Sequence, residues 1–346
     1  NLKKAIEDLE ITVLSVHPQN TARRHSVHAI DRKNIRKIYR AIRNCDVLIS
    51  GGGSLLQDVT SGRSIIYYLG IMMIGIFLKK KVFIYSQGIG PINRRLNRLM
   101  VRWVLNRVDC ITVRDEKSKK ELEDLGVCVP PIHVTADPVI TLPKGDLSVG
   151  RQILEAEGLC EDFDKPLIGF ALRGWQKNEK FRQAICKAAD SLIHQYDANI
   201  VFIPFHYGED MHILEEIEKE MENKAIFIKN RYDVQTLLGI VGNLDLLIGV
   251  RLHSLIFAAI MNTPMIAVSY DPKIDSFMKS LGLEILCSID DLEVDGLLKA
   301  VEQKWDCYKQ EKEVLNDRVQ ALQERVHMNE LLLIRLLVQG EDAHEK

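Results

Sequence analysis

Several patterns that would assign a protein class at once are missing from this sequence of 346 residues. None of the seven cysteines forms a CxxC pair and their number is odd, which argues against a zinc site and against a disulfide framework. The ten histidines supply no metal-ligand set, because His25 and His28 have helical spacing but no nearby third ligand. No GxSxG nucleophile elbow occurs. We therefore expect reduced cysteines in a cytoplasmic protein, with no metal and no cofactor.

A hydrophobic run long enough to span a membrane is also missing. Residues 64–78 read SIIYYLGIMMIGIFL, which is 15 residues, whereas a spanning helix needs roughly 20. A strand-like segment, KVFIYS, follows almost at once. We interpret residues 64–78 as a buried helix that covers a sheet, in a protein that contacts a membrane only at its surface.

Acidic residues are scarce in the first third of the chain. Residues 1–109 carry 19 basic and 7 acidic side chains, a net charge of +12, and the remaining residues carry 27 and 41, a net charge of −14. Between Lys79 and Val108 there are eight basic residues and no acidic one. The two parts of the chain are therefore expected to face different partners, and the basic part suits an anionic lipid, a phosphorylated substrate or nucleic acid.

Strand-like and helix-like segments alternate along the chain, which predicts an α/β fold with two Rossmann-like parallel-sheet domains and a ligand cleft between them. A stretch with Pro and Gly near residues 142–150 marks the hinge. We predict an N-terminal basic domain over 1–141, a C-terminal domain over 142–310 and a helical tail over 311–346. The first residues have helical spacing, so we expect a first strand and loop to precede them. Short β-rich runs lie at 11–15, 46–50, 82–86, 110–113, 167–172, 199–203, 225–228, 244–249 and 265–268.

The most distinctive turn joins an apolar strand to an apolar helix at residues 249–254, GVRLHS. It places Arg251 and His253 at the carboxyl end of a strand and the amino end of a helix, where free N–H groups favour an anion. A guanidinium matches carboxylate or phosphate, and His can transfer a proton near neutral pH. The alternative is an ordinary Arg and His at a helix cap.

Other strands of the same domain also end in basic side chains. Arg173, His206 and Lys273 each follow one of these strands. Taken singly, each is typical of a protein surface. Together with Arg251 and His253 they predict a cationic site for a small anion at one sheet edge.

Two predicted helices concentrate the basic charge of the N-terminal domain. At helical spacing, their arginines share one face and apolar side chains lie behind them. These are Ile35, Ile38, Tyr39 and Ile42 on the first helix and Leu96, Leu99, Trp103 and Val104 on the second. Such faces fit an anionic membrane surface or a lipid diphosphate. Nucleic acid is not expected, since no base-reading motif accompanies them. The membrane-facing candidates are Arg32, Arg36, Arg40, Arg94, Arg98 and Arg102.

Five segments together resemble the polysaccharide pyruvyl transferase family, and most closely its bacterial cell-surface-anchoring CsaB type. They are DVLISGGGSLLQD (46–58), YSQGIGP (85–91), VRDEKS (113–118), ADP (136–138) and GVRLHS (249–254). The resemblance implies a fold similar to GT-B glycosyltransferases and transfer of the pyruvate unit of phosphoenolpyruvate onto a sugar, forming a ketal and releasing phosphate. For the CsaB type it implies a lipid-diphosphate-linked acceptor with N-acetylmannosamine, whose pyruvylated polymer anchors S-layer proteins.

The resemblance also implies roles for particular residues. Arg251, Leu252 and His253 match the family's donor-binding triplet, and Arg173 matches a further donor arginine. Arg114, in the VRDEKS segment, is a candidate at the cleft. The further candidates for the acceptor and the cleft are Gly51, Gly52, Gly53, Gln87 and Gly88. From the residues themselves, the glycine triplet follows a strand and opens a helix, which suits either backbone contact with a phosphate or tight packing at the turn.

Combined with the residues themselves, the resemblance leads to one reaction hypothesis. His253 is the general acid, Arg173, Arg251 and Lys273 hold the donor anion, and two sugar hydroxyls, O4 and O6, add in turn. A carboxylate or His206 is the base. We expect the protein at the cytoplasmic face of the membrane, peripherally associated. The alternatives are a nucleotide-sugar glycosyltransferase of the GT-B type and a non-catalytic membrane-surface scaffold.

Overall fold

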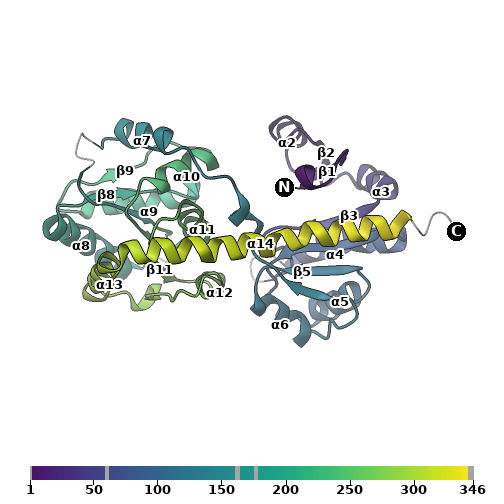
Figure 1. The fold of residues 1–346 in the computed structure, drawn as a ribbon. Helices are drawn as coiled ribbons and strands as arrows, with labels where there is room; N and C mark the ends of the chain where they lie inside the picture. The colour runs from purple at the N-terminus through teal and green to yellow at the C-terminus, as the bar shows by residue number, and fades with distance from the viewer. Residues whose placement is uncertain (1, 59–61, 160–163, 175–177, 342–346) are drawn as a thin grey trace. The chain divides into compact units, whose positions relative to one another are not determined.

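The computed structural model describes residues 2–58, 62–159, 164–174 and 178–341, which form two compact units. Unit 1 comprises Asn1–Pro138 together with Gln323–Lys346, and unit 2 comprises Val139–Leu322. Each unit contains a parallel β-sheet covered by helices (Figure 1), so the predicted α/β fold with two Rossmann-like parallel sheets is confirmed.

Unit 1 is built on a four-stranded parallel sheet in the order β3-β4-β5-β6, beside a separate parallel pair, β1-β2. The strands are β1 (Thr12–Ser15), β2 (His28–Asp31), β3 (Val47–Gly51), β4 (Lys81–Gln87), β5 (Cys110–Val113) and β6 (Ile132–Val134). The helices are α1 (Leu2–Ala5), α2 (Pro18–His25), α3 (Ile35–Asn44), α4 (Gly62–Phe77), α5 (Arg95–Leu105) and α6 (Glu116–Asp124). A short 3-10 helix, η1 (Pro138–Thr141), leads from unit 1 into unit 2.

The alternation of side chains along β4 gives the sheet of unit 1 two covered faces. Val82 and Ile84 pack on one face with residues of α4 and α5. Phe83 packs on the other face with Leu333 and Leu336 of α14 (Tyr308–Glu341), the long yellow helix of Figure 1. Because successive strand residues point to opposite faces, a strand buried on both sides is apolar at successive positions, as Val82 to Tyr85 are.

Unit 2 is built on a six-stranded parallel sheet in the order β12-β11-β10-β7-β8-β9. The strands are β7 (Leu167–Ala171), β8 (Asn199–Phe202), β9 (Ile226–Phe227), β10 (Leu246–Gly249), β11 (Met265–Ser269) and β12 (Cys287–Ser288). The helices are α7 (Leu147–Ala156), α8 (Glu179–Tyr196), α9 (Tyr207–Glu220), α10 (Val234–Gly242), α11 (Leu252–Met261), α12 (Pro272–Ser280) and α13 (Val294–Asp306), with a short 3-10 helix, η2 (Ile289–Asp291).

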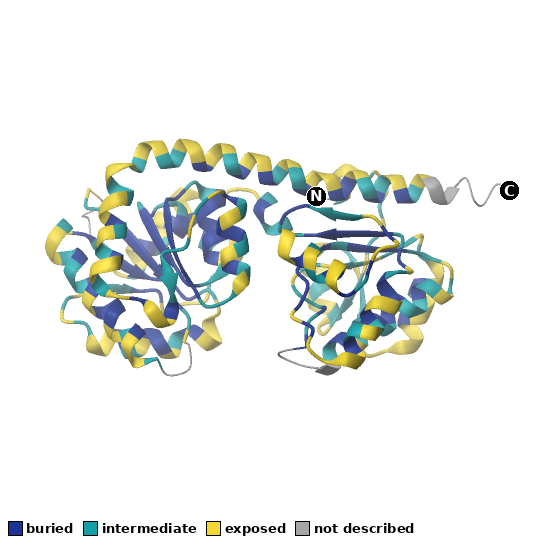
Figure 2. Ribbon diagram, turned by 90° about the horizontal axis from the view of Figure 1, so that it is seen from below, coloured by how far each residue is buried: buried dark blue, intermediate teal, exposed yellow. Residues whose placement is uncertain are grey.

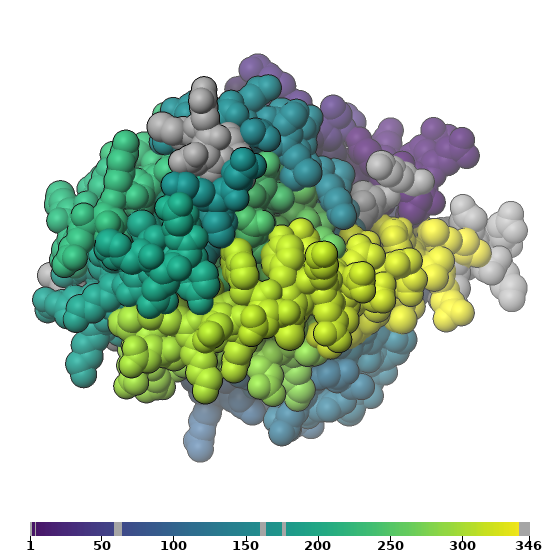
Figure 3. Space-filling model, turned by 60° about the vertical axis from the view of Figure 1, so that its left-hand side comes forward, coloured from purple at the N-terminus to yellow at the C-terminus, as the bar shows by residue number. Residues whose placement is uncertain are grey.

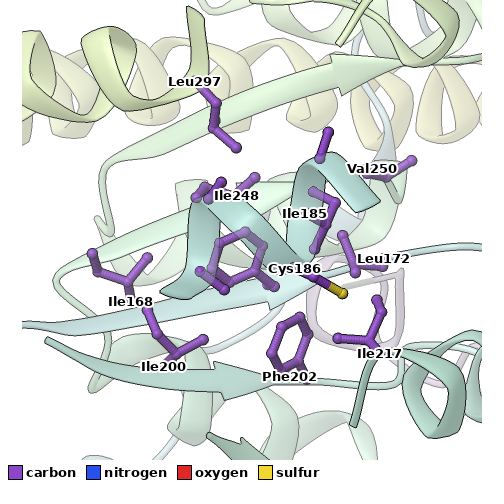
Figure 4. Packing of buried hydrophobic residues seen from close by; sticks show 14 of the residues in the cluster. Ile168, Leu172, Ile185, Cys186, Ile200, Phe202, Ile217, Ile248, Val250 and Leu297 are labelled. Carbon is purple, nitrogen blue, oxygen red and sulfur yellow. The ribbon is translucent and has the colours of Figure 1, made fainter. Parts of the chain in front are cut away.

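The core of unit 2 lies between this sheet and the helices α8, α9 and α13. Figure 4 shows Phe202 and Ile248 of the sheet beside Ile185 of α8, Ile217 of α9 and Leu297 of α13. The strands are mainly buried, whereas the helices expose their outer faces (Figure 2). Burying side chains of this size stabilises a fold by about 1.5–3 kcal/mol each, so the sheet edges that carry the loops are held on a rigid base.

The last helix differs from the predicted separate tail over 311–346. Residues 308–341 form one helix, α14, whose part up to Leu322 belongs to unit 2 and whose part from Gln323 belongs to unit 1. Its outer side chains are visible at the surface in Figure 3. Of the helices in the described residues, none has the length and apolar character that crossing a membrane requires. The predicted helix at 64–78 is α4, which buries Ile65, Leu69 and Met72.

Candidate functional site

The four neighbouring strands β11, β10, β7 and β8 of unit 2 run parallel, so their carboxyl ends meet at one edge of the sheet. Lys273, Arg251, Arg173 and His206 follow these strands in that order. The topology thus brings to one edge the residues that the sequence predicted there.

Arg251 is held by two carboxylates that follow β8. It occupies the N-cap position of α11, and its Nε donates a hydrogen bond to Oδ1 of Asp210 at 3.1 Å. Its Nη2 contacts the same oxygen and also donates to Oε2 of Glu209 at 3.0 Å. Burial opposes the charge of Arg251, but the hydrogen bond and the charge of Asp210 outweigh it and raise the pKa of the guanidinium. Arg251 therefore stays charged in the free protein.

The buried carboxylate of Asp210 holds both Arg251 and the loop after β8 in place. Its side chain is fully buried, and Oδ2 accepts hydrogen bonds from the backbone N–H groups of Phe205 at 3.1 Å and His206 at 2.7 Å. One carboxylate therefore ties the loop after β8 to the guanidinium after β10. Asp210 and Glu209 were not among the predicted site residues, although both stand in the first turn of the helix that follows His206.

Glu209 lies between two arginines. Nη2 of Arg173 is 4.0 Å from its Oε2, and Nδ1 of His206 is 3.9 Å from the same atom. The hydrogen bond from Arg251 is the largest influence on this carboxyl group and lowers its pKa. Arg173 is oriented by Tyr270, since its Nη1 donates to the phenol oxygen at 2.5 Å and its Cζ lies 4.7 Å from the ring centroid. The predicted cationic side chains are therefore paired with acids, because Asp210 and Glu209 both contact Arg251.

The remaining donor-site candidates lie nearby along the chain. His253 is an exposed residue in the first turn of α11, and Leu252 is the half-buried first residue of that helix. Lys273 is half-buried in the first turn of α12, and its Nζ is 3.9 Å from Oδ2 of Asp271, the N-cap of that helix.

In unit 1, three loops meet at the carboxyl ends of the parallel strands β3, β4 and β5. The backbone N–H of Gly88 donates to the carbonyl of Gly53 at 2.9 Å, and that of Gly52 donates to Tyr85 at 3.2 Å. Gly52 and Gly53 have φ values of +81° and +60°, a backbone region that favours glycine. Gln87 donates from Nε2 to the Ser50 carbonyl at 2.9 Å. Hydrogen bonds thus join the glycine triplet after β3 to the loop after β4.

Arg114 completes this loop cluster. Its guanidinium is almost fully buried and donates to Oδ2 of Asp137 at 2.9 Å and to the Ser54 hydroxyl at 3.4 Å. Its Nε lies 3.5 Å from Oδ2 of Asp115. Gly88 packs directly against it, because a Cβ built there would lie 2.8 Å from both Nε and Nη2 of Arg114. The acceptor candidates predicted from the sequence therefore lie together.

The basic helices of unit 1 depart from the predicted pattern in one respect. Leu96, Leu99 and Trp103 of α5 were expected behind the arginines, but 65%, 63% and 42% of their surfaces are exposed. Val104, which was expected behind the arginines as well, is buried together with Asn97, Val101 and Leu105. On α3, Ile35 and Tyr39 are likewise exposed, while Ile38 and Ile42 are buried. Of the arginines, Arg32 precedes α3, Arg36 and Arg40 lie on it, and Arg94 and Arg102 are exposed at α5.

Arg98 differs from the other arginines of α5. Its Nη1 donates to the Ile92 carbonyl at 3.1 Å and lies 3.8 Å from Oε1 of Glu121. Within the described parts of the chain, no three His, Cys, Asp or Glu side chains gather in the way a metal ion would require.

The fold is of the Rossmann-like, parallel-sheet type, and its structural neighbours are GT-B-like glycosyltransferases and epimerases. Anabaena HepE, solved in complex with UDP, aligns with a TM-score of 0.62 at 10% identity, covering 93% of this chain and 89% of that one. UDP-GlcNAc 2-epimerase from Neisseria meningitidis, bound to UDP-GlcNAc, aligns with a TM-score of 0.62 at 10% identity, covering 94% and 91%. At these identities the likeness shows the fold alone.

The sequence comparison is more specific. The profile of the polysaccharide pyruvyl transferase family matches residues 1–272, so the chain belongs to that family. It is also 21% identical over 307 residues to the amylovoran biosynthesis protein AmsJ of Erwinia amylovora, covering 84% of this chain and 72% of that protein.

Proposed function

We propose that this protein transfers the pyruvate unit of phosphoenolpyruvate onto a lipid-linked cell-wall polymer precursor that contains N-acetylmannosamine. The product is a 4,6-ketal, phosphate is released, and the pyruvylated polymer anchors S-layer proteins, as the resemblance to the CsaB type implies. Family membership supports the reaction class. The amylovoran relative supports a polysaccharide as the product.

The observation that carries the donor assignment is the carboxylate of Glu209 between two guanidiniums. An anionic group already occupies the point 3.0 Å from Arg251 and 4.0 Å from Arg173. Phosphoenolpyruvate carries both a carboxylate and a phosphate, which are the groups that guanidinium forks bind best. The donor therefore takes the place of Glu209 on the arginines, and Asp210 keeps Arg251 in position while this exchange occurs.

The chemistry then follows from charge that develops on the donor. His253 protonates the methylene carbon, which leaves an oxocarbenium-like centre at the neighbouring carbon. The first sugar hydroxyl adds to that centre and releases its proton to a base, for which His206 is the candidate beside the site. The carbon–oxygen bond to phosphate then breaks, and phosphate leaves with the electron pair. The second hydroxyl adds, and its proton balances the charge of the departing phosphate.

The acceptor assignment uses the loop cluster of unit 1. Backbone N–H groups of a glycine-rich turn and the guanidinium of Arg114 suit a sugar or its diphosphate. The exposed arginines of α3 and α5 suit an anionic membrane surface, where a lipid-linked acceptor resides. Peripheral association with the cytoplasmic face is part of the proposal.

The experiment measures phosphate release from phosphoenolpyruvate in the presence of a synthetic lipid-diphosphate disaccharide ending in N-acetylmannosamine. We expect release that requires the acceptor and falls at least a hundredfold in His253→Ala, since general acid catalysis contributes about 10²–10⁴-fold. His212→Ala is the matched control, because this histidine on α9 is 82% exposed and lies outside the site. If the protein releases no phosphate but consumes a UDP- or GDP-sugar, the glycosyltransferase alternative replaces this proposal. If neither phosphoenolpyruvate nor a nucleotide-sugar is turned over in any arm of the experiment, the non-catalytic scaffold replaces this proposal.

A further inference from the structure

Helix α5 presents a stripe of large apolar side chains on its exposed side. Leu96, Leu99 and Trp103 are 65%, 63% and 42% exposed. At 3.6 residues per turn, their directions fall within about 60° of one another around the helix axis. The opposite side of α5 is the one that enters the core of unit 1. We call Leu96, Leu99 and Trp103 the α5 stripe.

Basic side chains border the α5 stripe. Arg95 and Arg102 are exposed on one side of it, about 40–120° away around the axis. Arg107 follows the helix, and its guanidinium lies over the Trp103 ring at 4.1 Å from the centroid and donates to the Trp103 carbonyl at 2.7 Å. An apolar stripe edged by arginines, with an indole among them, has the chemistry of a helix at a membrane interface.

The basic charge around the α5 stripe indicates which kind of partner can bind there. The segment from Lys79 to Val108 carries eight basic side chains and no acidic one. A second copy of the same surface would bring like charges together, which disfavours a symmetric contact between two copies. An anionic bilayer offers a partner for both the basic and the apolar side chains of this surface, since its headgroups pair with arginine and its acyl boundary accepts Leu and Trp.

We propose that α5 is a membrane-docking helix, which lies in the plane of an anionic bilayer with Leu96, Leu99 and Trp103 inserted among the acyl chains and Arg95, Arg102 and Arg107 at the headgroups. The sequence pattern placed these apolar residues behind the arginines of the helix, so the insertion follows from their exposure in the fold. The inference deepens the proposed function by naming the surface that meets a lipid-linked acceptor, but binding to a bilayer requires no turnover.

The test is flotation of the full chain with vesicles of phosphatidylcholine containing 30% phosphatidylglycerol. We expect Leu96→Gln/Leu99→Gln to lower the partition coefficient at least tenfold, with an unchanged circular dichroism spectrum and melting temperature. Leu331→Gln is the matched control, because Leu331 is 67% exposed on α14, the helix on the opposite face of the same sheet. It should change partitioning less than twofold. Brominated lipid should quench fluorescence of the wild type more than that of Trp103→Phe.

Three results would overturn the inference. Unchanged partitioning of the double variant would show that the α5 stripe does not insert, and an equal loss in Leu331→Gln would show a non-specific effect. A dimer detected by light scattering that the double variant abolishes, without vesicle binding by the wild type, would assign the stripe to a protein contact. Vesicle binding without phosphate release from phosphoenolpyruvate would refute the proposed function and leave this inference standing.

Discussion

Replacing Glu209 by glutamine tests whether the negative charge of Glu209 competes with the donor for the arginines of the proposed donor pocket. Glu209 is 52% exposed, and its Oε2 is shared by Arg251 at 3.0 Å, His206 at 3.9 Å and Arg173 at 4.0 Å. An incoming phosphate or carboxylate must compete with this carboxylate for the same guanidiniums. Glutamine keeps the shape of the side chain and removes the charge. The variant is therefore expected to bind small anions more tightly than the wild type.

Two free-energy contributions, both favouring anion binding by the variant, determine how much its affinity increases. An ion pair exposed to this degree contributes about 0.2–1 kcal/mol, which the wild type loses when the anion displaces Glu209. Repulsion between Glu209 and a unit negative charge about 4 Å away adds about 1 kcal/mol in a water-like dielectric. Their sum of about 1–2 kcal/mol corresponds to an affinity gain of roughly tenfold.

Titration calorimetry with phosphoenolpyruvate and with inorganic phosphate measures this gain. Glu216→Gln is the matched control, because Glu216 lies on the same helix and pairs with Arg182 at 3.1 Å, away from the site. The gain should also shrink as ionic strength rises, since salt screens the charges involved. Equal or weaker binding of both anions by Glu209→Gln would refute the argument that Glu209 holds the place of the donor.

Three further substitutions probe the Arg251 site, the loop cluster around Arg114, and Asp58, whose carboxylate accepts hydrogen bonds from the backbone N–H groups of Asn93 and Arg94. Asp210→Asn removes the buried charge that partners Arg251 and should lower the free energy of unfolding by about 3 kcal/mol in urea titrations; a change below 1 kcal/mol would contradict this. Gly88→Ala places a Cβ 2.8 Å from Arg114 Nε, so it should lower the free energy of unfolding by about 1–3 kcal/mol and raise the acceptor KM. Burial raises the pKa of Asp58, but its hydrogen bonds from backbone and side-chain donors outweigh this and lower it. Its contribution to stability is therefore present above pH about 4 and is lost as pH falls through the lower native pKa, so Asp58→Asn and wild type should converge in stability at acidic pH.

The periodicity of the sequence determined the α/β fold because the information is local. The run VFIY (82–85) is apolar at successive positions, which is typical of a strand covered on both faces, and it became part of β4. The same local reasoning placed Arg173, His206, Arg251 and Lys273 after strands. Because all carboxyl ends of a parallel sheet lie at one edge, their shared location followed from the prediction of a parallel sheet.

Partners and exposure were decided only by the tertiary structure. The pairing of Arg251 with Asp210 joins residues 41 positions apart, and no local pattern specifies which loop supplies a counter-charge. Likewise, the sequence pattern set Leu96, Leu99, Trp103 and Val104 behind the arginines of α5, but it did not show which of these side chains the sheet covers. The fold buries Val101, Val104 and Leu105 and leaves Leu96, Leu99 and Trp103 outside, because the sheet can cover only one side of a helix packed on its surface. The sequence by itself therefore determined where basic side chains gather, and the tertiary structure determined what each of them contacts.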